Sequence, residues 1–200
     1  MPYFNIVAET SENTVVTEYE PVKKRSDSYQ SEAALEQEFI RLLCEQGYEY
    51  LPIHTEKDLI ANLRKKLEEL NNYQFSDTEW NDFFKNAVAN PNEHIVEKTR
   101  KIQEDNIQVL TRDDGSSKNI TLIDKKNIHN NRLQVINQYV IGTENGAKHD
   151  NRYDVTVLVN GLPLVHVELK RRGVAIREAF NQINRYQRES FWAGCGLYEY

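Results

Sequence analysis

The 200-residue sequence contains only two cysteines, five prolines and eight glycines. Cys44 and Cys195 form no CxxC pair, so the sequence indicates neither a disulfide framework nor a zinc site. No apolar run approaches the ~20 residues that cross a bilayer, and the N-terminus lacks the basic start and cleavage site of a secretory signal. These absences predict a cytoplasmic protein with no membrane partner.

Basic residues are in the minority, because 25 Lys and Arg stand against 31 Asp and Glu for a formal net charge of -6. Over the whole chain this balance is weak evidence against nucleic-acid binding, which depends on clustered Lys and Arg. The segment from Leu169 to Arg188 is different. Its basic residues are Lys170, Arg171, Arg172, Arg177, Arg185 and Arg188, against Glu178 alone. This segment could face an anion, although a solvated helix face explains the same charges.

Hydrophobic residues make up 39% of the chain and charged residues 28%, which is typical of one globular domain with a single core. Apolar periodicity predicts helices over about 32–45, 55–73, 76–88 and 174–188. Strands are predicted at 3–9, 14–20, 48–53, 106–111, 119–127 and 133–141, with a hairpin at 151–173. The order of these elements predicts a mixed α/β domain with an at least partly antiparallel sheet.

The hairpin segment NRYDVTVLVNGLPLVHVELKRRG, residues 151–173, carries charged residues among apolar ones. Side chains alternate between the two faces of a strand, so Glu168 and Lys170 share one face at about 6.6 Å along the strand. The opposite face, which we expect to be the core face, carries Val165, Val167 and Leu169. The charges are therefore predicted to gather on one side of the sheet.

The turn of the hairpin decides whether Asp154 reaches that same face. A two-residue Asn160-Gly161 turn would place Asp154 opposite Val167, on the wrong face to meet Glu168. A three-residue loop with the glycine in a left-handed bulge would place Asp154 opposite His166 and restore the shared face. We therefore expect a loop or bulge that shifts the register by one residue.

With that register, Asp154 and Glu168 would be neighbours on adjacent strands, and their oxygens could coordinate one hard cation. Mg²⁺ fits because it prefers oxygen ligands and keeps positions for water and phosphate, and Mn²⁺ can substitute for it. Lys170 could orient a nucleophile or offset developing negative charge. The pattern indicates phosphodiester hydrolysis, although each residue taken alone is also explained as a surface charge at a strand end.

These residues resemble the motifs of the PD-(D/E)xK nucleases, with Asp154 and Glu168-Leu169-Lys170 in the motif positions. Gln182 and Tyr186, which share a helical face at spacing i, i+4, resemble the QxxxY motif of the RecB-like branch. Where the motif has proline, this sequence has Tyr153. The segments SEAALEQEFIRLLCEQGYEYL and LIDKKN, together with residues 151–191, look like the N-terminal nuclease domain of the R subunit of type I restriction endonucleases, from about residue 29 onward.

The resemblance implies a restriction-endonuclease-like mixed β-sheet flanked by helices, with extra N-terminal strands and helices. It also implies magnesium-dependent cleavage of double-stranded DNA in a complex with modification and specificity subunits. Asp154 and Glu168 would then be metal ligands and Lys170 the catalytic lysine. The residues that would support the site or contact DNA are Gln182, Tyr186, Arg185, Arg171 and Arg172.

A further carboxylate, Glu36, falls within the apolar sector of the first predicted helix. It resembles the first-helix glutamate of archaeal junction resolvases, which supports the metal site. We therefore add Glu36 to the expected metal-binding residues. A glutamate at the helix border that reaches solvent is an equal alternative.

No GxxxxGK[ST] phosphate loop occurs in the sequence, so ATP is expected to bind only in motor domains outside it. We expect an N-terminal extension with short strands over 1–30 and a truncated nuclease domain over 31–200. Two alternatives stay open. One is an inert interaction module that docks through the helices between Glu56 and Asn90, and the other is a stand-alone junction resolvase or repair nuclease.

Overall fold

The computed structural model describes residues 3–9, 15–20, 31–141, 151–171, 173–186 and 196–198. The helices are α1 (Glu32–Glu45), α2 (Glu56–Asn71), α3 (Asp77–Phe83), α4 (Ile95–Gln103) and α5 (Ile176–Tyr186). The strands are β1 (Tyr3–Glu9), β2 (Val15–Glu20), β3 (Glu49–Tyr50), β4 (Ile107–Thr111), β5 (Ser117–Thr121), β6 (Leu133–Ile141), β7 (Asn151–Val159) and β8 (Leu162–Val167). Among the helices within these ranges, none has the length and apolar character needed to cross a membrane.

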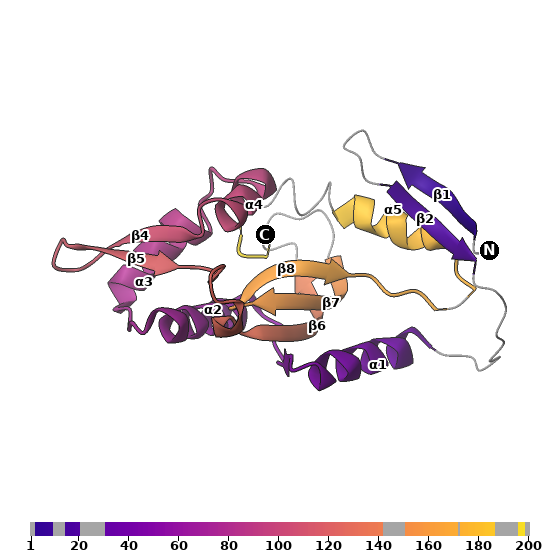
Figure 1. Ribbon diagram of the computed structural model, residues 1–200, viewed down its shortest axis with the longest axis horizontal. Coiled ribbons are helices and arrows are strands. Elements are labelled where there is room, and N and C mark those ends of the chain that lie inside the picture. Colours follow the sequence, from indigo (N-terminus) through magenta and orange to yellow (C-terminus); the bar gives the residue numbers. More distant parts are fainter. Residues whose placement is uncertain are drawn as a thin grey trace.

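A mixed sheet in the strand order β3-β6-β7-β8 forms the centre of the molecule (Figure 1). Strands β6, β7 and β8 form an antiparallel meander, and β3 pairs in parallel with β6. β1 with β2 and β4 with β5 form two separate antiparallel ribbons. The mixed α/β fold predicted from the sequence is confirmed.

Helices cover both faces of the central sheet, with α1 on one side and α5 on the other (Figure 1). On the α1 side, Leu43 packs with Val135 and Val155, and Val167 and Leu169 join them. The larger core lies on the other face and includes α2, whose inward residues are Leu59, Leu63 and Leu67. Val165 shares the face on the α1 side, because it pairs with Val157, but it is 49% exposed, so the core on that side does not extend over it. It lies in β8, which among the described strands is at the edge of this sheet beside β7.

Helix starts follow the capping signals in the sequence. The side chains of Ser31, Thr55 and Ser76 accept backbone N–H groups at the starts of α1, α2 and α3. Ser76 and Glu79 form a full capping box. The helix predicted over 76–88 continues beyond α3 as a π-helical turn, Phe84–Val88. The strand predicted over 48–53 shortens to the two residues of β3. The strand predicted over 119–127 lies instead at Ser117–Thr121.

The turn between β7 and β8 is a two-residue Asn160-Gly161 turn with φ of +52° and +86°. Positive φ at both residues is typical of the tight turns that match strand twist. The fully buried Asn160 side chain accepts the Arg132 N–H at 2.8 Å and donates to the Leu122 carbonyl at 3.0 Å. A Cβ at Gly161 would lie 2.6 Å from the Leu63 Cα. The turn is therefore fixed against α2.

A β-bulge follows this turn in β8. Leu158 pairs with Pro163, whereas Val157 pairs with Val165, so Leu164 is an extra residue. Pro163 suits the position because it has no N–H to place in the ladder. The predicted one-residue shift is confirmed, but it arises from a bulge after a two-residue turn, and the predicted three-residue loop is wrong.

Candidate functional site

The bulge sets which side chains of β7 and β8 face each other. Thr156 pairs with His166, so the predicted pairing of Asp154 with His166 is wrong. Continuing the same register by two residues places Asp154 opposite Glu168. Because directly opposite residues share a face, the two carboxylates stand together, as the shifted register was expected to achieve.

The carboxylates and the lysine form one compact group. The Glu168 side chain is only 3% exposed and is ion-paired with the Lys170 ammonium, whose side chain is 18% exposed. The backbone N–H of Leu169 donates to Asp154 Oδ2 at 2.8 Å. This hydrogen bond ties the end of β8 to the start of β7. Asp154, Glu168 and Lys170 are therefore held close together by the backbone of the hairpin.

The neighbouring charges in this group shift the pKa values of Glu168 and Lys170. Burial raises the pKa of Glu168, and the neighbouring Asp154 carboxylate raises it further against the opposing effect of Lys170. Burial lowers the pKa of Lys170, but the hydrogen bond and charge of Glu168 outweigh burial, so the pKa is raised overall. The lysine thus stays an ammonium, while the two carboxylates repel each other. A cation bound between them would relieve that repulsion.

Helix α5 contributes the glutamine and tyrosine that the sequence singled out. Gln182 Nε2 donates to the Tyr186 hydroxyl, and this hydroxyl donates to the Arg152 carbonyl at 2.8 Å. The same hydroxyl lies 3.4 Å from Glu168 Oε2. Burial raises the pKa of Tyr186, so the hydroxyl keeps its proton as a donor. The tyrosine hydroxyl that Gln182 contacts therefore lies beside Glu168.

Tyr153, which stands where the nuclease motif has proline, is 2% exposed. Its ring centroid lies 4.5 Å from that of Tyr186, 5.5 Å from that of His166 and 4.8 Å from that of Tyr198. Burial lowers the pKa of His166 to about 4, so the imidazole is neutral near pH 7. Tyr153 therefore supports the helix that carries the QxxxY residues. Sequence reasoning did not identify His166 or Tyr198 here, because buried aromatic residues carry no signal beyond core formation.

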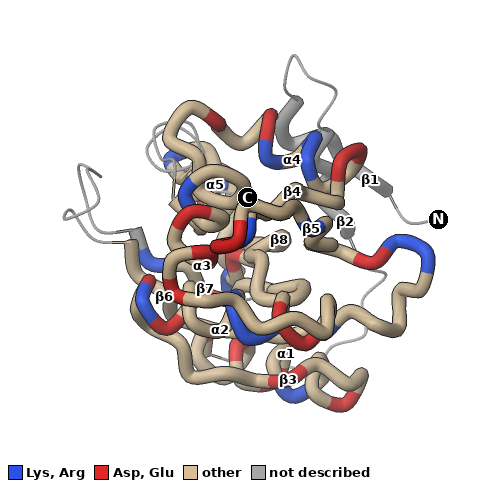
Figure 2. Tube along the Cα trace, turned by 90° about the vertical axis from the view of Figure 1, so that its left-hand side faces the viewer, with Lys and Arg blue, Asp and Glu red and all other residues tan. Residues whose placement is uncertain are grey.

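Two of the three arginines predicted to contact DNA, Arg171 and Arg185, are described by the structure. Arg171 is exposed, and its backbone N–H donates to Glu32 Oε1 at 3.3 Å. The exposed Arg185 places its guanidinium carbon 5.4 Å from the centroid of the Tyr186 ring. Arg172 lies outside the described residues. Elsewhere, acidic and basic residues are interspersed over much of the described trace (Figure 2).

Glu36 is buried, with 9% of its surface exposed, and its carboxylate accepts hydrogen bonds from two side-chain amides. It accepts Asn137 Nδ2 at 2.6 Å and also accepts the Gln138 side-chain N–H. Across the parts of the chain that the structure describes, no group of three or more His, Cys, Asp or Glu side chains is close enough to hold a metal ion. A cation at Asp154 and Glu168 would take its remaining ligands from water or substrate.

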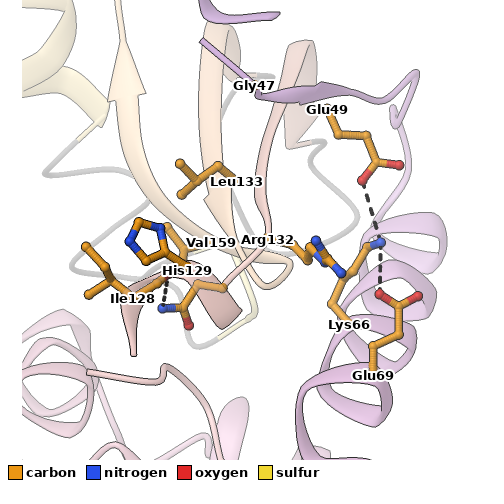
Figure 3. Close-up of a pocket in the computed structure, with 10 residues that line it drawn as sticks. Gly47, Glu49, Lys66, Glu69, Ile128, His129, Arg132, Leu133 and Val159 are labelled. Atoms are coloured by element: carbon orange, nitrogen blue, oxygen red, sulfur yellow. Dashed lines mark hydrogen bonds and ion pairs between the residues drawn. The ribbon is translucent and has the colours of Figure 1, made fainter. Parts of the chain in front are cut away.

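A separate pocket of about 790 Å³ lies at the opposite end of the sheet, where β6 begins and β7 ends (Figure 3). Its Lys66 ammonium lies 3.5 Å from Glu49 and 3.3 Å from Glu69, so both carboxylates are ion-paired with the same lysine. Val159 in its wall is five residues from Asp154, or about 16 Å along the strand. The pocket is therefore separate from the paired carboxylates.

The mixed sheet flanked by helices, with an acidic pair and a lysine where β7 begins and β8 ends, defines a restriction-endonuclease-like α/β protein. A family model described as "Type I restriction enzyme R protein N terminus" matches residues 29–200. The chain belongs to this family.

Curated relatives agree with this assignment. The EcoprrI endonuclease subunit of Escherichia coli is 49% identical over 195 residues, covering 97% of this chain and 61% of that subunit. The SsaAORF53P endonuclease subunit of Staphylococcus saprophyticus is 38% identical, and the match covers 86% of this chain and 18% of that subunit. The HindI endonuclease subunit of Haemophilus influenzae is 30% identical, and the match covers 80% of this chain and 17% of that subunit. The chain thus spans less than two thirds of each relative.

Proposed function

We propose that this chain is the DNA-cleaving domain of a type I restriction enzyme and that it hydrolyses phosphodiester bonds of double-stranded DNA. The observation that carries the proposal is the bulge-shifted register, which sets Asp154 beside Glu168 while Lys170 is ion-paired with Glu168. The names of the relatives, each an endonuclease subunit, support the same activity. Residues 31–200 would form the nuclease domain and residues 1–30 an extension.

Asp154 and Glu168 are the residues that would hold Mg²⁺, or Mn²⁺ in its place. Two carboxylates and several waters suit Mg²⁺, which is commonly bound through one or two carboxylates. The raised pKa of Glu168 fits a carboxylate pair whose repulsion a cation would offset. When bound, the cation would lower the pKa of its water and stabilise negative charge on the phosphate.

The other residues act on this pair or on DNA. Lys170, held as an ammonium beside Glu168, would offset charge that develops on the scissile phosphate. The Tyr186 hydroxyl, oriented by Gln182, would hold Glu168 in place. The exposed Arg171 and Arg185, together with Arg172, would bind the phosphate backbone.

Further partners follow from the family. We infer that modification and specificity subunits position this domain on DNA and that the complex works in the cytoplasm. ATP would be used only by motor domains outside these 200 residues. The recognition sequence would then be set by another subunit, because the proposed roles of Arg171 and Arg185 concern phosphates and not bases.

The test is to replace Glu168 or Lys170 by Ala in the assembled complex. Cleavage should fall by at least about 100-fold, the lower end of the effect of removing one group that stabilises transition-state charge. ATP hydrolysis and translocation should be unchanged. Lys126→Ala, at an exposed lysine outside the site, is the control. Persistent nicking by both variants would contradict the assignment. A preference of the wild type for branched over linear DNA would favour a junction resolvase instead.

A further inference from the structure

Gln138 has an unusual backbone conformation in the middle of β6. Its φ is +50°, in the left-handed region that side-chain-bearing residues avoid. The strand continues on both sides, because Asn137 pairs with Val155 and Tyr139 pairs with Tyr153. A strained residue of this kind persists only where surrounding contacts hold it.

The contacts that hold Gln138 come from α1. The Glu36 carboxylate accepts the Gln138 side-chain N–H at one oxygen and Asn137 Nδ2 at the other, the latter at 2.6 Å. The Tyr50 hydroxyl of β3 donates to Asn137 Oδ1 at 3.0 Å. Since Glu36 is 9% exposed, its carboxylate depends on these amides to replace water. Helix α1 thereby fixes the strained point of β6.

This strained point faces the acidic pair. The register of β6 and β7 places Gln138 opposite Asp154, between the pairs Asn137–Val155 and Tyr139–Tyr153. Gln138 and Asp154 do not form a regular β-sheet pair. Asp154 is therefore released from regular pairing on the β6 side, while the Leu169 N–H holds its carboxylate from the β8 side. The position of Asp154 depends on how β6 bends at Gln138.

We propose that Glu36 is a positioning residue of the cation site. By holding Gln138 in the left-handed conformation, it sets the distance between the carboxylates of Asp154 and Glu168. The inference rests on the proposed function and differs from direct metal binding by Glu36, because amide donors occupy both of its oxygens.

The test uses Mn²⁺ binding to the 200-residue chain, measured by calorimetry. Glu36→Ala should weaken binding by about tenfold, the lower end of the effect of removing an outer partner of a metal ligand. Adding Gln138→Gly should restore most of the affinity, since glycine adopts positive φ without strain. Glu38→Ala removes an exposed glutamate of the same helix that bonds Arg41, and should leave affinity unchanged.

Each outcome separates the two roles of Glu36. Unchanged affinity in Glu36→Ala, or a loss that Gln138→Gly does not restore, would overturn the positioning role, and the second result would favour direct ligation. If Glu36→Ala does not fold, Glu36→Gln, which keeps one acceptor oxygen, should show a smaller loss that Gln138→Gly again restores. In the assembled complex, Glu36→Ala should lower kcat for cleavage with little change in KM for DNA. If wild-type binding does not depend on Asp154 and Glu168, the proposed function fails instead.

Discussion

Replacing Gly161 by Ala tests whether the turn is fixed against α2 as the structure indicates. The substitution has two costs. A left-handed φ of +86° costs a residue with a Cβ roughly 1–2 kcal/mol. The new Cβ would also lie 2.6 Å from the Leu63 Cα and 3.0 Å from the Leu63 nitrogen, both backbone atoms that cannot rotate away. Overpacking of this kind costs typically about 1–3 kcal/mol. The expected loss of unfolding free energy is therefore about 2–5 kcal/mol.

Gly115→Ala provides the matched control. Gly115 has φ of +80°, but nothing lies within 4 Å of a Cβ built there. Only the conformational cost of about 1–2 kcal/mol should appear, and the gain from a stiffer unfolded chain is the same in both variants. Urea unfolding followed by far-UV circular dichroism measures both free energies. Equal losses in the two variants would refute the close approach of the turn to α2.

Two further stability predictions concern the site and its turn. Burial and Asp154 raise the pKa of Glu168, so the folded chain binds a proton at this carboxyl more readily than the unfolded chain does. In metal-free buffer, stability should therefore fall as the pH rises from 4.5, the ordinary pKa of a glutamate, through the raised pKa. In the Glu168→Gln variant, Tm should decrease less with rising pH than in the wild type. An unchanged slope of Tm against pH would contradict the raised pKa of Glu168 as the cause. Asn160→Ala should cost about 2–4 kcal/mol in urea unfolding, since buried groups such as the Leu122 carbonyl lose their partner. The exposed Asn127→Ala should change stability by less than about 0.5 kcal/mol.

The hairpin illustrates how far sequence reasoning reaches. Strand alternation predicts which face of the sheet carries Glu168. A shared metal site requires Asp154 to lie on that same face, and from this requirement a register shift could be predicted. The place of the shift could not. Asn160-Gly161 favours a two-residue turn, and whether the extra residue falls in the turn or at Leu164 depends on how the turn packs against α2.

Helix α4 was not predicted because its inward face carries lysines. Lys98 is fully buried and donates to the Gly196 carbonyl, and Lys101 donates to the Ala87 carbonyl at 2.5 Å. Both acceptors are backbone atoms, Gly196 lying 98 residues away in the sequence. Hydrophobic periodicity misses a helix whose buried positions are charged, since burial depends here on partners that only the fold supplies.

Glu36 shows a similar limit. The helical pattern correctly placed it in a buried sector, but its partners Asn137 and Gln138 lie about a hundred residues further along the chain. No local spacing relates them. The positive φ of Gln138 likewise has no signature in the sequence, because glutamine is an ordinary residue in strands and helices.

Metal binding by Asp154 and Glu168 is the central claim, and calorimetric titration of Mn²⁺ into the 200-residue chain tests it most directly. The account predicts a binding heat that Asp154→Asn and Glu168→Gln each abolish while both variants stay folded, and that Lys126→Ala leaves intact. Binding that survives in both site variants, or no binding heat in the wild type, would contradict the account and favour the inert interaction module.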